Sequence, residues 1–140
     1  MVSVTKDNPL MFKNVGGYLV LKFYGEGVAV SSIRLEGKND EKLSGQATMK
    51  PEIGVLPKIS MTETAGTSVT LTCDEPIELS ADKENATVFW MVVPPTTFSK
   101  GFKLTVTGPD GKTSVKETDK SLTIIRNTLL RISPVEVKLN

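Results

Sequence analysis

The sequence predicts an all-β fold, a two-sheet β-sandwich with Greek-key-like connections of the immunoglobulin or transthyretin kind. Apolar and polar residues alternate with a period of two through most of the chain, as they do in strands with one buried face. Glycine, proline and Asn/Asp clusters interrupt this alternation about every ten residues, where turns are expected. The chain has 140 residues, enough for one core and too few for two. We therefore expect residues 1–140 to form a single domain of about eight strands.

The first half of the chain contains two clear strands followed by a long connection. In residues 18–24 every second side chain is apolar, which predicts a strand with one face in the core. The expected inward residues are Leu19, Leu21 and Phe23, and the expected outward residues are Tyr18, Val20, Lys22 and Tyr24. In residues 28–35 the apolar phase changes at Ser31-Ser32, which predicts a β-bulge. Residues 50–66 are expected to form a connection with at most one short strand.

Two further strands are expected in the middle of the chain. Residues 68–73 alternate, with Val69 and Leu71 facing inward. Residues 87–93, with the sequence TVFWMVV, are apolar on both faces, and this predicts a central strand that is covered on both sides. Pro94 and the proline after it end this strand, because proline cannot donate a hydrogen bond to a neighbouring strand.

The last third of the chain is expected to be β as well. The sequence Gly-Pro-Asp-Gly at 108–111 predicts a hairpin between residues 102–107 and 112–118. Residues 122–132 also fit a helical period, but they are rich in β-branched side chains, which favours strand. Residues 134–140 alternate like an edge strand, with Val135, Val137 and Leu139 inward. The expected core residues are Leu19, Leu21, Phe23, Ile33, Leu35, Val69, Leu71, Leu104 and Val106.

Composition and charge exclude several classes of function. Seventeen basic and sixteen acidic residues give a net charge of +1, too little to attract nucleic acid or an anionic membrane. The chain has no histidine, which removes Ser-His-Asp and Cys-His catalysis and imidazole metal ligands. No run of about 18 apolar residues is present, so we expect no membrane-embedded segment, and the first ten residues do not read as a signal peptide.

Five segments, read in order, resemble a known family. They are FKNVGGYLVLKFYGEG, VSSIRLEGKNDEKLSGQATM, SVTLTCDEPIELS, ATVFWMVVPPTTFSKGFKLTVTGPDGK and SLTIIRNTLLRI. The most distinctive parts are residues 32–45, residues 93–102 and the sequence Ile125-Arg126-Asn127. Over residues 12–132 the chain resembles the fimbrillin-like surface proteins of Bacteroides-type bacteria.

This resemblance implies a location and a set of partners. It implies an exported β-sandwich that is either secreted or displayed at the cell surface on the outer membrane, commonly as a lipoprotein or in fimbria-like adhesive assemblies. The expected partners are other surface or fimbrial subunits, or host or dietary glycans. The family's N-terminal lipobox signal and its further sandwich domain are not in this sequence, so we expect one domain of a longer exported protein. The resemblance brings no catalytic residue with it.

The candidates for chemistry among the polar residues have simpler structural explanations. Three carboxylate pairs fall in turn-like segments where solvated surface charge is expected, namely Asp74 with Glu75, Asp82 with Glu84, and Glu117 with Asp119. The loops 38–41 and 82–85 carry oxygen ligands without the spacing of a calcium loop. The single cysteine, Cys73, is in phase with the inward residues of its strand, so we expect an unreactive core thiol. We expect no catalytic residue, metal or cofactor.

Three aromatic side chains are candidates for stacking on sugar rings, Tyr18, Tyr24 and Trp90. The two tyrosines share a face but lie about 20 Å apart along the strand, too far to grip one small saccharide. Because Trp90 lies in the most apolar strand, core packing is the stronger expectation for it.

Two hypotheses follow for function. The first is a non-enzymatic structural or adhesive module of a cell-surface, fimbria-like protein. The alternative is a carbohydrate-binding module of a surface glycan-uptake system, which requires two exposed aromatic residues within about 10 Å of each other. For assembly, the predicted edge strand is the C-terminal one with Val135, Val137 and Leu139, which either pairs with another subunit or closes the domain's own sheet.

Overall fold

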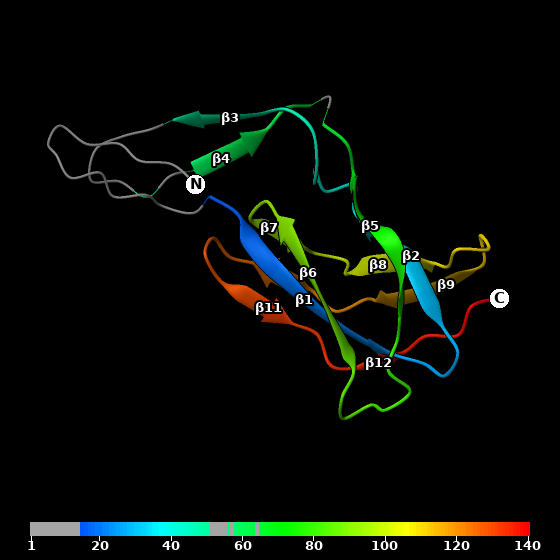
Figure 1. Ribbon diagram of the computed structural model, residues 1–140. Helices are drawn as coiled ribbons and strands as arrows, with labels where there is room; N and C mark the ends of the chain where they lie inside the picture. Colours follow the sequence, from blue (N-terminus) through cyan, green and yellow to red (C-terminus); the bar gives the residue numbers. More distant parts are fainter. Residues whose placement is uncertain (1–14, 51–55, 57, 64) are drawn as a thin grey trace, which may run out of the picture.

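The architecture is an all-β sandwich, as the alternation predicts (Figure 1). The structure is a computed structural model, and it describes residues 15–50, 56, 58–63 and 65–140. These residues form strands and turns, with no helix among them. The first ten residues, which the sequence analysis does not identify as a signal peptide, lie outside the described residues, as does part of the long connection at 50–66.

The first main sheet is built around β1 (Gly17–Tyr24). On one side β1 pairs antiparallel with β6 (Thr87–Val93). On the other side it pairs parallel with β11 (Leu129–Arg131) and then with β12 (Val135–Glu136). Strands from the two ends of the chain therefore meet in one sheet.

The second main sheet has the order β5-β2-β8-β9, with antiparallel neighbours throughout. Its strands are β5 (Ser68–Glu78), β2 (Ala29–Gly37), β8 (Phe102–Thr107) and β9 (Thr113–Thr118). Two small antiparallel pairs complete the described part of the fold. They join β7 (Thr96–Phe98) to β10 (Leu122–Ile124) and β3 (Ala47–Lys50) to β4 (Lys58–Met61).

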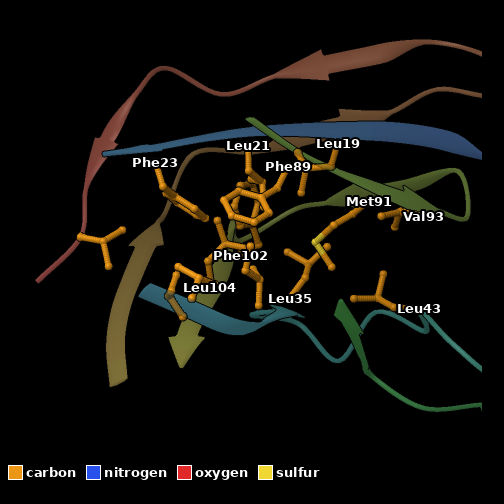
Figure 2. Close-up of a cluster of buried hydrophobic side chains, with 14 of the residues drawn as sticks. Leu19, Leu21, Phe23, Leu35, Leu43, Phe89, Met91, Val93, Phe102 and Leu104 are labelled. Carbon is orange, nitrogen blue, oxygen red and sulfur yellow. The ribbon is translucent and has the colours of Figure 1, made fainter. Parts of the chain in front are cut away.

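The core lies between the two main sheets, and the predicted inward residues occupy it. Side chains of β1 and β6 point toward side chains of β2 and β8 in Figure 2. Seven of the nine expected core residues are at most 3% exposed, and these are Leu19, Leu21, Phe23, Ile33, Leu35, Leu104 and Val106. The other two, Val69 and Leu71, are partly buried and pack against this core.

Local features also agree with the sequence pattern. The register of β2 against β5 shifts between Val30 and Ser32, which confirms the bulge. The hairpin between β8 and β9 forms at Gly108 to Gly111, where the Gly111 N–H donates to the Gly108 carbonyl at 3.1 Å. Residues 122–132 form β10 and β11 around a turn, which confirms the prediction of strand over helix.

The position of β6 differs from the prediction. We expected residues 87–93 to form a central strand, but β6 pairs only with β1 and lies at the edge of its sheet. Phe89, Met91 and Val93 enter the core, whereas Val88, Trp90 and Val92 are exposed. The prediction was wrong because a short run that is apolar on both faces has the same local pattern in a central strand and in an edge strand with an exposed apolar face.

The C-terminal segment pairs within its own domain. Val137 is 1% exposed and its N–H donates to the Tyr24 carbonyl at 2.8 Å. At the very end, Thr113 and Asn140 exchange two backbone hydrogen bonds, so the segment also touches the start of β9. Val135 and Leu139 are partly buried against the core. Closure of the domain's own sheet, one of the two expected outcomes, is the arrangement in this single chain.

Candidate binding surface

The outward side of the first main sheet carries a group of apolar and aromatic side chains that are exposed or partly exposed, here called the outer face. It consists of Tyr18 on β1, Val88, Trp90 and Val92 on β6, and Leu129 on β11. Trp90 is 53% exposed and Val92 is 65% exposed. Scattered apolar residues are normal on a protein surface, but a contiguous apolar group marks a candidate interaction site.

Strand register places these side chains beside one another. Tyr18 lies directly opposite Val92 on one neighbouring strand and opposite Leu129 on the other. Val20 lies between Trp90 and Arg131 in the same way, and it is only 2% exposed. Because side chains of directly opposed residues lie about 5 Å apart, three strands contribute to one continuous surface.

The indole of Trp90 lies next to the Tyr18 ring. The two ring centroids are 6.4 Å apart and the planes meet at 72°, an edge-to-face arrangement of the kind that aromatic pairs favour. The expectation that Trp90 packs in the core is therefore wrong. Its strand supplies the core through odd-numbered residues, so the even-numbered Trp90 faces outward. Tyr24 is partly exposed at the other end of β1 and takes no part in this aromatic pair.

Charged side chains border the apolar surface. Lys22 is directly opposite Val88, and Arg131 follows Leu129 at the next outward position of β11. The strand β6 itself has no titratable residue. The outer face is therefore an apolar stripe along β6, with cationic residues on the β1 and β11 side. An apolar centre with charged residues at its border is typical of a protein interface.

Asp74 and Glu75 are exposed on β5, whereas the other two predicted carboxylate pairs contribute contacts to local structure. Glu117 and Asp119 both bind the ammonium of Lys38, at Nζ–O distances of 3.1 and 2.5 Å. Hydrogen bonding to Asp119 is the largest cause that raises the pKa of Lys38, and the bond to Glu117 adds to it, while partial burial opposes them. Asp82 accepts hydrogen bonds from the Glu84 backbone and from the Asn85 side chain. Asp82 therefore closes the turn at 82–85.

The remaining candidates are consistent with structural roles. Cys73 is partly buried against the core, and burial, followed by the charge of Asp74, raises the pKa of its thiol. Since the thiolate is the reactive form, this agrees with the expected low reactivity. Within the described residues no group of three or more Cys, Asp or Glu side chains is placed to hold a metal ion.

An open groove of about 370 Å³ lies between β9 and the segment from β11 to β12, and no sequence pattern predicts it. Its lining is mainly apolar and includes Leu104, Leu122 and Ile132. Lys116, Lys120 and Arg131 also line it. The groove depends on how the two sheet edges are spaced, which alternation along single strands does not determine.

No helix among the described residues is long and apolar enough to cross a membrane. Comparison of the chain with protein-family models, curated proteins and solved structures finds no match.

Proposed function

We propose that this domain is a non-enzymatic adhesive or structural module of a bacterial cell-surface, fimbria-like protein, and that it binds its partners through the outer face. The observation that supports this is the exposure of Val88, Trp90 and Val92 on a single edge strand. An enzyme gathers its polar groups in a concave site, whereas a binding module presents apolar and aromatic side chains on an accessible surface. The resemblance to fimbrillin-like proteins supports the surface location and the fimbrial or lipoprotein character.

Adhesion by beads coated with the purified domain tests this proposal. We expect wild-type beads to adhere to intact cells of the source bacterium, and Trp90→Ser beads to adhere at least about tenfold less, because the central aromatic residue of an interface is a typical hot spot. Val115→Ser is the matched control, since Val115 is also 53% exposed but lies on β9. Equal loss in both variants, or antibody labelling of cells only after permeabilisation, would contradict the proposal.

Carbohydrate binding is the second candidate, and the pairing of Trp90 with Tyr18 favours it. The rings lie 6.4 Å apart, within the separation that one saccharide requires, although Tyr18 is only partly exposed. Such a site would stack a sugar ring on the indole and use the tyrosine hydroxyl as a polar contact. A glycan-array screen distinguishes the two functions. Binding that Trp90→Ala abolishes and Tyr24→Ala leaves unchanged would establish a glycan module, while an array without binding would leave protein contact as the function.

A further inference from the structure

One edge of β6 pairs with no strand among the described residues, and it supports an inference that goes beyond the proposed function. In β1, the Tyr18 N–H donates to the Thr128 carbonyl, and the carbonyls of Val20 and Tyr24 accept from Ile132 and Val137. The even-numbered residues of β1 therefore direct their backbone groups away from β6. Because backbone direction alternates along a strand, the odd-numbered residues of β1 bond to β6.

This alternation determines which backbone groups of β6 remain available. Leu19 and Leu21 lie opposite Met91 and Phe89, so those residues of β6 bond to β1. The N–H and C=O groups of Val88, Trp90 and Val92 then point to the open edge, where no strand among the described residues pairs with them. The same three residues expose their side chains on the outer face.

The edge of β6 also lacks the features that prevent edge strands from pairing between molecules. Charged residues and prolines discourage the pairing of edge strands between molecules. The other edge strands of the two main sheets carry such residues: β5 has Asp74 and Pro76, β9 has Lys116, β11 has Arg131 and β12 has Glu136. The seven residues of β6, by contrast, are uncharged and contain no proline. Nothing in this strand opposes the approach of a second strand of the same sequence.

We propose that β6 pairs antiparallel with β6 of a second copy of the domain about a two-fold axis through Trp90. Residues at equal distances from the axis then face each other, so Val88 meets Val92 of the second copy and Trp90 meets its own equivalent. Each of these positions has outward backbone groups, which gives about six hydrogen bonds, two for each bonded pair. The pairing keeps odd-numbered residues on the core side and joins the two outer faces into one.

A second copy of the domain is favoured over a strand of another protein because the residue pattern of β6 is complementary to its own reverse. Its outward side chains read Val-Trp-Val in either direction, and its lack of charge means that two copies do not repel each other. A seven-residue edge provides less contact than the roughly 1,200 Å² that the smallest stable interfaces bury. The dimer is therefore a reversible one that forms as concentration rises, or where many copies are crowded together.

Light scattering at increasing concentration, together with amide hydrogen exchange, tests this pairing. We expect the mass to rise from 15.2 kDa toward twice that value. We also expect the amides of Val88, Trp90 and Val92 to exchange at least about tenfold more slowly at high concentration, because pairing buries them. The amides of Phe89 and Met91 bond within the domain and should be protected at every concentration.

Two variants of matched chemistry complete the test. Val92→Lys places a charge in the paired edge and should hold the domain at 15.2 kDa, while Val115→Lys on β9 should dimerise like the wild type. A wild type that stays monomeric overturns the pairing. So does a dimer whose three outward amides remain unprotected, since that would be face-to-face stacking, or a dimer that both lysine variants disrupt equally. Adhesion to intact cells is scored separately, so a failed dimer leaves the proposed function standing.

Discussion

At the scale of single residues, β8 alternates between the core and the surface. Phe102 and Leu104 are each 3% exposed, whereas the side chain of Lys103 is 42% exposed. We expect Phe102→Ala and Leu104→Ala each to lower the free energy of unfolding by about 2 to 5 kcal/mol, through lost burial and a residual cavity. Lys103→Ala should change it by no more than about 0.5 kcal/mol, although Lys103 pairs with Glu36 at 3.2 Å, because exposed ion pairs contribute little.

Denaturant melts of the three variants measure this difference. The slope of the transition should be similar for all of them, so that the midpoints report stability. If Lys103→Ala were the most destabilising of the three, the register of β8 in the sandwich would have to be shifted by one residue.

Lys38 gives a residue-scale prediction about pH. Its pKa in the folded domain is raised above the ordinary 10.5, chiefly by hydrogen bonding to Asp119. A raised pKa means that the folded state holds the proton more tightly than the unfolded state does. The stabilisation by Lys38 is therefore complete below pH 10.5 and is lost as the pH rises through the folded-state pKa.

Comparison with Lys38→Met across this pH range isolates the contribution of the ammonium. The wild type should be the more stable protein at neutral pH, and the two should converge at strongly alkaline pH. A difference that stays constant with pH would show that Lys38 acts through packing of its aliphatic chain rather than through its charge.

At the scale of elements, the turn that leads into β8 depends on Gly101. This glycine has a φ of +81°, and a Cβ atom there would lie 1.8 Å from the Thr118 carbonyl oxygen. Gly111 in the next hairpin has nearly the same φ, +82°, but a Cβ atom there would meet nothing within 4 Å. The two positions separate backbone strain from steric overlap.

We expect Gly111→Ala to cost about 1 to 2 kcal/mol, the strain of a left-handed conformation. Gly101→Ala should cost that amount and about 1 to 3 kcal/mol more, because the β9 backbone would have to move. Thermal or denaturant melts of the two variants make the comparison. An equal loss of unfolding free energy at the two positions would mean that the Thr118 carbonyl moves aside without destabilising β9.

The strands differ in how well their buried and exposed faces can be predicted from the sequence. In β1 and β8 the alternation separates the core side from the opposite side, so the direction of each side chain could be predicted, although the outward Val20 is also buried. In β6 both faces are apolar, and the local pattern is the same for a central strand and for an exposed edge. Pairing is decided by residues far away in the chain, such as the β1 partners of Met91 and Phe89. For this reason the exposure of Trp90, and with it the candidate binding surface, was not predictable.

At the scale of the whole molecule, the fold depends on joining the two ends of the chain. β1 near the beginning pairs with β11 and β12 near the end, and the three strands share one sheet. Contacts so distant in sequence have to overcome the entropy of closing a long loop before they stabilise the domain. Folding is therefore expected to be slow for a domain of this size and to require the complete C-terminal segment.

Deletion of residues 133–140 is the direct test of this dependence. It removes Val137, which is 1% exposed, together with the bonds to the Tyr24 carbonyl and to Thr113. Burial of the valine side chain alone is worth about 1.5 to 3 kcal/mol, a large part of the roughly 5 to 15 kcal/mol that stabilises an ordinary domain. We expect a truncated protein that is largely unfolded or aggregated in circular dichroism and light scattering.

A synthetic peptide with the sequence PVEVKLN then distinguishes closure of the domain's own sheet from strand exchange between subunits. A strand that only closes its own sheet loses its advantage when detached, because binding the separate peptide costs entropy that the intact chain has already paid through covalent linkage. We therefore expect no rescue, and the same result with a control peptide in which the valines and the leucine are replaced by serine. A folded truncated monomer that binds PVEVKLN but not the serine peptide would show instead that β1 accepts an added strand. Strand addition through Val135, Val137 and Leu139 would then be a second mode of assembly between subunits, besides the pairing of β6 strands.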